Sequence, residues 1–419
     1  MPKDLTQIIS DLVLDWENPK RIVFGRGQTK NLGSILNSYM QLKSAVIVTD
    51  ENIEKAGILE KVNSSANEAG IKTDIFKIPV HEPDMDTANN VANYAHSKSF
   101  DAVIGVGGGS AMDMGKLMAM MKTNPGKPLD YCALPPDALS EKVKNRPVPE
   151  ILIPTTAGTG SEQSNTLVII ENGYKTWITS NKLYATIALV DPENTYTTPP
   201  NATRSSGVDA MSHLLEGLIS SLHNPVSDGT IIEGVKLVYD YLPRSYNNGN
   251  DVEARTALSL SSTMGGWVLG LPWVGGPATI GHCLSEGFGP KLNIPHGLAC
   301  GLMLPHVIDF NRNFIGERMK KVLIALEPDE DYFDFSTQEA TDVLIRKIVD
   351  LLKAVEINPA VKYNTKESRD TFFSMIDYVL NERQYLYNLP AYNPRRLTRD
   401  NLTNLFEDIW EGKFTTNEF

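Results

Sequence analysis

Strand-like and helix-like segments alternate through the first 190 residues of this 419-residue chain. Apolar, β-branched runs occupy 44–50, 72–78 and 101–110, another begins at Glu150, and helical patterns lie among them. Such alternation is typical of a parallel sheet with helices on its faces. This part of the chain is therefore constrained to an α/β arrangement.

Individual elements can be placed within this alternation. Apolar periodicity predicts helices over 52–69, 86–98 and 111–121. Two short apolar runs, 166–170 and 175–179, flank an Asn-Gly pair, which predicts a hairpin.

The periodicity changes near 191–204, a turn-rich segment that we take as the domain boundary. Beyond it the patterns are almost purely helical, apart from a Gly- and Pro-rich stretch at 271–282 that predicts a loop. We therefore expect an α/β domain over residues 1–195 and an all-α domain over residues 196–419.

Composition narrows the range of functions. Acidic residues outnumber basic ones by 51 to 39, and a surface with a formal net charge of −12 repels nucleic-acid phosphates. The three cysteines form no paired motif, which disfavours a disulfide framework and indicates a reducing compartment. No run approaches the ~18 apolar residues of a membrane span, and no secretion signal is recognisable. We expect a soluble, cytoplasmic protein without nucleic-acid or membrane partners.

Two Gly-rich loops follow predicted strands. Gly108 and Gly109 end one strand and Ser110 opens a helix, so backbone N–H groups there can meet a phosphate. Ser110 stands where a GxGxxG pattern has its third glycine, and a plain tight turn is the other interpretation. A second loop, 154–161, follows another strand. Two such loops at the carboxyl ends of strands in one sheet favour a dinucleotide across the crevice.

Asp50 ends an earlier strand and has two interpretations. Its carboxylate could accept hydrogen bonds from a ribose and would repel a 2′-phosphate. It could equally cap the helix that starts near Asn52. The sequence leaves both open.

One carboxylate and three imidazoles offer a metal site in the second half. Asp209 and His213 are four residues apart on a predicted helix and share a face, and His282 and His296 each lie beside a glycine. This donor set suits Fe²⁺ or Zn²⁺. For each residue alone, a chance pair or a core histidine is the simpler interpretation. Spacing alone therefore leaves the site a hypothesis.

Four segments resemble, in order, the motifs of the iron-dependent (group III) alcohol dehydrogenase family. They are GGGSAMDMGK, PTTAGTGSE, GVDAMSHLLEGLIS and NIPHGLACGLMLPHV. KRIVFGRG near the start and NPRRLTRDNLTNLFEDIW near the end look like the family's termini, so the likeness covers nearly the whole chain. The resemblance implies a Rossmann-like N-terminal domain followed by a helical domain, the dehydroquinate synthase-like fold.

The resemblance also implies roles for particular residues. Family members hold one divalent metal with an Asp and three His, which match Asp209, His213, His282 and His296. An Asp matching Asp50 goes with NAD(H) rather than NADP(H). The other positions that match the family's nicotinamide-binding residues are Gly108, Gly109, Ser110, Thr155, Thr156, Thr159 and Lys175.

Two features depart from the family pattern. Many members carry a histidine four residues after the first loop ligand, where this chain has Glu286. Glu286 either replaces that proton relay or only shapes the pocket. The segment between Gly266 and His282 is several residues longer than usual and contains Trp267 and Trp273, which form either a pocket wall or core. The substrate's identity is therefore not carried over.

We expect a metal- and NAD(H)-dependent alcohol dehydrogenase or aldehyde reductase with a small-molecule substrate. The resemblance also implies a homodimer or a larger homo-oligomer, although no segment of the sequence identifies an interface. Two alternatives stay open. A metal- and NAD-dependent sugar-phosphate cyclase of the same fold needs a cluster of basic residues and typically has Glu in place of His213. A non-catalytic binding module would be expected to have lost a ligand, whereas all four candidates are present.

Overall fold

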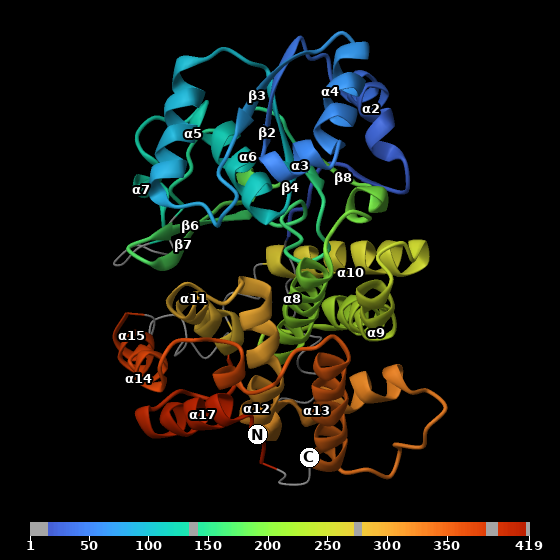
Figure 1. The fold of residues 1–419 in the computed structure, drawn as a ribbon, viewed down its shortest axis with the longest axis vertical. Helices are drawn as coiled ribbons and strands as arrows, with labels where there is room; N and C mark the ends of the chain where they lie inside the picture. Colours follow the sequence, from blue (N-terminus) through green and yellow to red (C-terminus); the bar gives the residue numbers. More distant parts are fainter. Residues whose placement is uncertain (1–15, 134–140, 272–278, 383–392, 416–419) are drawn as a thin grey trace.

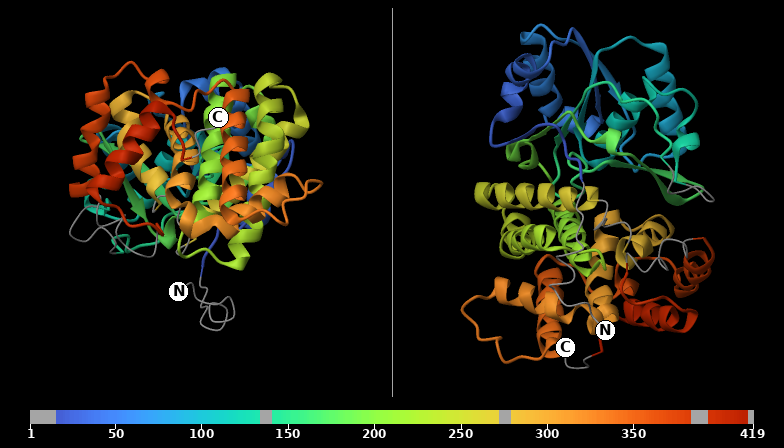
Figure 2. Two further views of the ribbon diagram at one scale, coloured as in Figure 1. Left: turned by 90° about the horizontal axis from the view of Figure 1, so that it is seen from below. Right: turned by 180° about the vertical axis from the view of Figure 1, so that it is seen from behind.

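The computed structural model describes residues 16–133, 141–271, 279–382 and 393–415. A lobe made of a sheet with surrounding helices stands above a lobe made of helices (Figure 1), and the view from behind shows the same division (Figure 2). The predicted order, an α/β unit followed by an all-helical one, is confirmed. The 195/196 boundary falls between η3 (Pro192–Thr195) and α8 (Pro200–Ile219) and stays a prediction.

The main sheet has six strands in the order β1-β8-β5-β4-β2-β3, and every neighbouring pair is parallel. The chain runs from β2 outward to β3 and then returns to the other side of β2, so the order reverses between β2 and β4. In doubly wound sheets, ligands bind outside the carboxyl ends of the strands at such a reversal. The strands are β1 (Ile22–Phe24), β2 (Ser44–Thr49), β3 (Lys72–Lys77), β4 (Ala102–Gly107), β5 (Glu150–Pro154) and β8 (Ile187–Val190).

Alternate residues of the central strands face opposite helical layers. In β2, Ala45 and Ile47 pack with α2 and α4, whereas Val46 and Val48 pack with α5 and α6. Because both faces are covered, the strand is a continuous apolar run, which is why its sequence is recognisable. These helices are α2 (Leu32–Tyr39), α4 (Ile58–Glu68), α5 (Met85–Ser97) and α6 (Gly109–Met121).

The predicted hairpin is confirmed as β6 (Thr166–Glu171) and β7 (Tyr174–Thr179). Asn172 and Gly173 have φ values of 54° and 78°, as a two-residue I′ turn requires. The hairpin lies at the lower edge of the sheet lobe, facing the helices (Figure 1).

The prediction of one helix over 52–69 is wrong. The segment forms α3 (Glu51–Lys55) and α4, because Gly57 between them adopts a left-handed φ of 72°. Sequence patterns also did not predict three other short elements of this lobe. They are α7 (Pro128–Tyr131), η1 (Gln28–Asn31) and η2 (Asn181–Leu183).

The helical lobe shares one large apolar core, and its longest described helix, α12, packs against α8 and α13. Within the described ranges, no helix is both long and apolar enough to cross a membrane. The helices are α9 (Pro225–Asn247), α10 (Val252–Gly270), α11 (Ile280–Leu292), α12 (His296–Leu326), α13 (Thr337–Ala354), η5 (Val361–Tyr363), α14 (Arg369–Phe373), α15 (Met375–Glu382) and α17 (Arg399–Glu411).

The lobes meet where the loop after β5 reaches α10. Gly160 has a φ of +59°, and a Cβ on it would lie 2.4 Å from the Cα of Gly266. A Cβ on Gly266 would in turn lie 2.1 Å from the Gly160 carbonyl oxygen. Beside this contact, Thr263 donates a hydrogen bond of 3.1 Å to the buried Glu162 carboxylate. The second Gly-rich loop is fixed by backbone-to-backbone packing.

Gly266→Ala is expected to destabilise the protein by about 1–3 kcal/mol, because the added methyl group overlaps the Gly160 backbone. Urea unfolding followed by circular dichroism measures the change. Gly229→Ala is the control: Gly229 is exposed on α9 with open space around it, so alanine should stabilise by up to ~1 kcal/mol. Equal stability of the two variants would contradict the close packing of the lobes.

Candidate active site

A cavity of about 500 Å³ lies between the lobes, outside the carboxyl ends of the strands. Its walls come from the start of α6, the loop after β5, the hairpin, and helices α8, α11 and α12. The side chains of Val168, Ile169, Ile170 and Leu269 make part of the wall apolar. An apolar cavity with a few converging polar groups is the usual form of a small-molecule site.

The two Gly-rich loops lie side by side at this cavity. Ser110 at the start of α6 lines it, together with Thr156 and Thr159 of the second loop. Gly109 permits the close approach of the loops, because a Cβ there would lie 2.8 Å from Thr159 Cγ2. The structure thus brings together the residues that the sequence placed in two separate loops.

Backbone groups complete this part of the site. Gly108 is the N-cap of α6 and has no side chain to accept hydrogen bonds from the first-turn N–H groups. Thr155 is buried, and its N–H donates to the Gly107 carbonyl at 2.9 Å, which ties the two loops together. An uncapped helix N-terminus beside a cavity is a favourable place for a phosphate.

Asp50 caps a helix, as one of its two interpretations predicts. Its Oδ1 accepts hydrogen bonds from the backbone N–H groups of Asn52 at 2.8 Å and Ile53 at 3.2 Å. Its other oxygen lies 3.6 Å from where a Cβ of Gly107 would be, next to the first Gly-rich loop. The ribose contact stays a prediction, and the capping bonds do not compete with it because they use one oxygen.

Lys175 on β7 lines the cavity and forms an ion pair of 2.7 Å with Glu82. Glu82 also lines the cavity, from the segment between β3 and α5. Nothing in the sequence around Glu82 singles it out, because its partner is 93 positions away. The pair fixes the hairpin at one side of the cavity.

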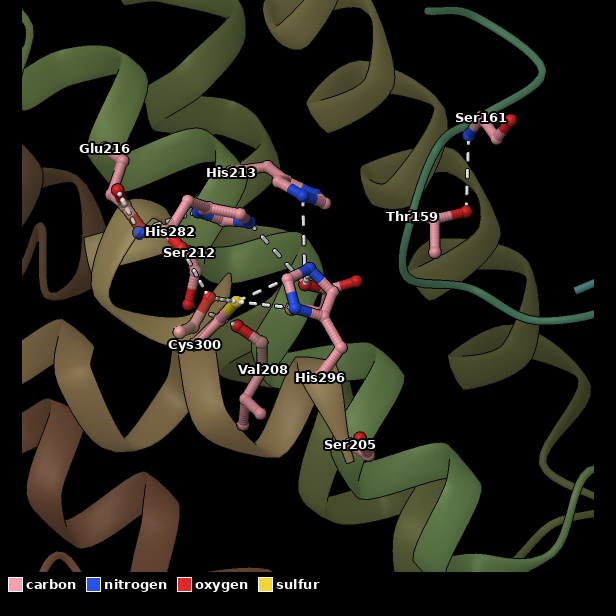
Figure 3. Close-up of polar contacts among 12 residues, drawn as sticks. Thr159, Ser161, Ser205, Val208, Ser212, His213, Glu216, His282, His296 and Cys300 are labelled. Carbon is pink, nitrogen blue, oxygen red and sulfur yellow. Dashed lines mark hydrogen bonds and ion pairs between the residues drawn. The ribbon is translucent and has the colours of Figure 1, made fainter. Parts of the chain in front are cut away.

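The four predicted metal ligands converge at the floor of the cavity. Asp209 Oδ1 lies 3.7 Å from His213 Nε2, 3.8 Å from His282 Nε2 and 3.8 Å from His296 Nε2. The imidazole rings of these histidines lie around one small space (Figure 3). Asp209 and His213 share a face of α8, as the i, i+4 spacing predicts, while His282 and His296 lie in the first turns of α11 and α12.

This cluster fits a divalent cation. Asp209 Oδ1 and His282 Nε2 are buried, and neither has a hydrogen-bond partner among the described residues. Buried polar atoms are almost always satisfied, so two orphaned acceptors facing one another indicate a missing positive group. One carboxylate and three imidazoles form a donor set that suits Fe²⁺ or Zn²⁺.

Electrostatics agree with this interpretation for three of the four groups. Burial would raise the pKa of Asp209, but the neighbouring histidines outweigh it and hold that pKa well below its usual range. Burial lowers the pKa of His213 to about 4, and burial together with Lys175 lowers the pKa of His296. Burial would lower the pKa of His282, but the neighbouring Cys300 and Glu216 outweigh it and hold that pKa above its usual value. Around neutral pH the site therefore presents an anionic oxygen and two neutral imidazoles, the forms in which these groups bind metal.

Close packing places His296. No side chain of its own segment caps the start of α12, and Ser205 of α8 accepts the orphan N–H of Leu298 at 3.1 Å. A Cβ on Gly297 would lie 2.3 Å from the Ser205 carbonyl oxygen and 2.8 Å from Asp209 Cβ. The glycine after His296 therefore lets α12 touch α8 at the ligands.

Two family models match this chain. The model of iron-containing alcohol dehydrogenases matches residues 19–192, and the model of the C-terminal region of that family matches residues 203–410. The chain belongs to the iron-containing alcohol dehydrogenase family. It is a metal- and nicotinamide-dependent alcohol dehydrogenase, acting on alcohols or aldehydes, as the motif resemblance predicts.

Individual relatives agree with this assignment. Long-chain-alcohol dehydrogenase 1 of Geobacillus thermodenitrificans is 33% identical over 68% of this chain and 70% of its own length. Sulfoacetaldehyde reductase of Bilophila wadsworthia is 30% identical over 94% of this chain and 98% of its own length. The structure of an alcohol dehydrogenase from Oenococcus oeni superposes with a TM-score of 0.85 at 26% identity, covering 95% of this chain and all of that one.

Sequence reasoning missed Glu216, which orients His282, one of the four candidate metal ligands. Its fully buried carboxylate accepts a hydrogen bond of 2.7 Å from His282 Nδ1 (Figure 3). It also accepts from the backbone N–H of His282 at 3.0 Å and from the Thr279 hydroxyl. In the neutral imidazole, donation from Nδ1 to Glu216 leaves Nε2, which faces Asp209, as an acceptor. Its i+7 position from Asp209 on α8 was the available signal.

Lys116 and Asp113 of α6 were also missed. Lys116 is fully buried and donates to the Thr166 carbonyl at 2.7 Å, at the start of the hairpin. Asp113 accepts from Ser161 Oγ at 2.6 Å and from the Val168 N–H at 2.9 Å. Burial raises the pKa of Asp113 and lowers that of Lys116. The two residues join α6 to the second Gly-rich loop and to the hairpin.

The structure describes two of the three residues at which the sequence departs from the family pattern. Glu286 is 7% exposed and lines the cavity one helical turn beyond His282. Trp267 is partly buried and packs against the helical core, which agrees with its core interpretation. Trp273 and most of the predicted 271–282 loop lie outside the described residues.

Glu216→Gln is expected to weaken divalent-metal binding by about 10–100-fold, because an amide cannot accept all three hydrogen bonds and no longer fixes the His282 tautomer. Competition with a chromogenic chelator measures the affinity. The control is Glu233→Gln, at an exposed position of α9. Unchanged metal affinity in the Glu216 variant, with its fold retained, would contradict the orienting role.

Proposed function

We propose that Asp209, His213, His282 and His296 hold the divalent metal of this dehydrogenase, and that the two Gly-rich loops hold its dinucleotide. One observation carries the proposal: a single buried carboxylate oxygen lies 3.7–3.8 Å from three imidazole nitrogens, in a cavity that also reaches the start of α6. Fe²⁺ and Zn²⁺ are the ions proposed, because both accept imidazole and carboxylate ligands.

The metal and the dinucleotide would supply the reactive groups, and the residues of the chain would position them. A divalent cation supplies Lewis acidity toward the substrate oxygen, and the nicotinamide accepts or supplies the hydride. The start of α6, with Gly108, Gly109 and Ser110, offers N–H groups to the pyrophosphate. Thr156 and Thr159 line the opposite side, and Lys175 bounds the cavity near His296. Thr155 is buried behind this wall and ties its loop to Gly107 through a backbone hydrogen bond. The chain would thereby hold the substrate carbon against C4 of the nicotinamide and shelter both from water.

Glu286 is the proposed proton acceptor for alcohol oxidation. Its carboxylate lines the cavity on the same face of α11 as His282, one turn away. A carboxylate there can take the hydroxyl proton as hydride leaves and return it when an aldehyde is reduced. This role replaces that of the histidine found in many family members.

NAD(H) is the proposed dinucleotide, rather than NADP(H). Asp50 follows β2 at the reversal of strand order, where the adenosine ribose of a dinucleotide lies in doubly wound sheets. A carboxylate accepts hydrogen bonds from ribose hydroxyls and repels a 2′-phosphate. A relative, sulfoacetaldehyde reductase from Bifidobacterium kashiwanohense, has been solved in complex with NAD⁺, with a TM-score of 0.80 to this chain.

The substrate is proposed only as a small alcohol or aldehyde. Relatives are named for long-chain alcohols, methanol and sulfoacetaldehyde, which differ widely in size and charge. A panel of short aliphatic, hydroxylated, sulfonated and phosphorylated aldehydes, followed by NADH consumption with metal-loaded and chelator-treated enzyme, defines the pocket. Metal-dependent loss of NADH with at least one member is expected.

Replacing a proposed metal ligand, as in Asp209→Ala or His282→Ala, is expected to abolish metal binding. Turnover should fall more than about a hundredfold in either variant, because the metal is then absent. NADH affinity, measured by fluorescence titration, should change little because the proposed dinucleotide contacts lie on other elements. His223→Ala, at a partly exposed residue paired with Asp228, is the control. Full metal content and activity in either ligand variant would overturn the ligand set.

Asp50→Asn is expected to raise the NADPH-to-NADH ratio of kcat/KM by about tenfold, because it removes a charge that repels the 2′-phosphate. Asparagine retains the capping acceptor, so thermal stability should stay unchanged. Steady-state kinetics with both cofactors provides the test. A ratio that does not move would show that Asp50 is only a helix cap.

A further inference from the structure

A thiol lies within the metal-ligand cluster. Ligand atoms of Asp209, His282, His296 and Cys300 all lie within 4.8 Å of one another. His213 joins this group through its contact with Asp209 at 3.7 Å. The cluster therefore offers donor atoms from five residues rather than four.

Cys300 is held in this place by the fold. It lies one turn after His296 on α12, is fully buried, and has its Sγ 3.7 Å from either ring nitrogen of His296 (Figure 3). Ser285 of α11 lies 3.1 Å from the sulfur through its Oγ, on the side of His282. Two helices therefore fix the sulfur beside two of the imidazoles.

The spacing suits coordination. Zinc–sulfur bonds of about 2.3 Å and zinc–nitrogen bonds of about 2.0–2.1 Å place sulfur and nitrogen roughly 3.1–3.8 Å apart at the 90–120° angles of a five-coordinate site. The distance from Cys300 Sγ to the His296 ring nitrogens is 3.7 Å. The orphaned atoms of Asp209 and His282, both buried, face the same space and independently mark it as a cation position.

We propose that the Cys300 sulfur is a fifth ligand of the metal, bound as thiolate, with the thiol proton released to solvent when the metal–sulfur bond forms. The inference rests on the metal site proposed above. The described residues that line the cavity include Asp209, His213, His282 and His296 but not Cys300. The sulfur thus binds from the protein side, and the position facing the cavity stays open to substrate.

A sulfur ligand changes which metal the site prefers. Thiolate is a soft donor that favours zinc and cobalt over iron or manganese relative to a set of imidazole and carboxylate alone. Cys300→Ser keeps the side-chain size while replacing sulfur with a hard oxygen. Zinc affinity should fall more than about tenfold in this variant, and affinity for Mn²⁺ should fall less.

The experiment reads the metal–sulfur bond directly. The full-length protein is loaded with Co²⁺ under anaerobic conditions, and near-ultraviolet absorption is searched for cobalt–thiolate charge transfer. The band is expected in the wild type and in Cys132→Ser, whose buried thiol is in the other lobe, and absent in Cys300→Ser. X-ray absorption of the zinc-loaded wild type should show one sulfur at about 2.3 Å among lighter ligands, and needs no variant.

The outcomes separate the two proposals. Metal bound at one equivalent without a sulfur signal, or a band that persists in Cys300→Ser, overturns the role of Cys300 and leaves the ligand set of Asp209 and the histidines intact. Failure of the wild type to retain any metal, measured by elemental analysis after dialysis, overturns the proposed metal site itself.

Discussion

A carboxylate buried among three imidazoles is the interaction on which this structure depends. Asp209 is 2% exposed, and an ionised group at that depth costs several kcal/mol unless a cation compensates for it. The compensating groups come from α11 and α12 as well as from α8, so three helices must converge within a few ångströms. Glycines such as Gly297 make that convergence possible. The relative placement of α8, α11 and α12 is therefore tied to this one buried carboxylate.

Much of the fold was predictable because its signals are local. The buried strand 44–50, the Asn-Gly hairpin and the i, i+4 pair on α8 each need only a few consecutive residues to be recognised. The break between α3 and α4 was missed because a single Gly57 ends a turn inside an otherwise helical pattern. The three-residue β1 is too short for any periodicity.

The parts of the site that escaped prediction share one property: their partners are remote. Glu216 acts on a residue 66 positions away, and Lys116 on one 50 positions away. A Glu or Lys in an apolar helix has the same local sequence whether it snorkels to solvent or binds inward. Cys300 escaped for a different reason, since one cysteine between alanine and glycine resembles a small core residue. Only the packing of the helices reveals what these side chains meet.

The contact between Gly160 and Gly266 has a mechanical consequence. Two backbones in direct contact leave no side chain whose rotamer could yield, so the lobes cannot slide past one another there. Any widening of the cleft to admit a dinucleotide must therefore be a rotation with this point as its fulcrum. In such a rotation the threonines of the second loop, next to this contact, would move least, and the distant rim of the cleft would move furthest.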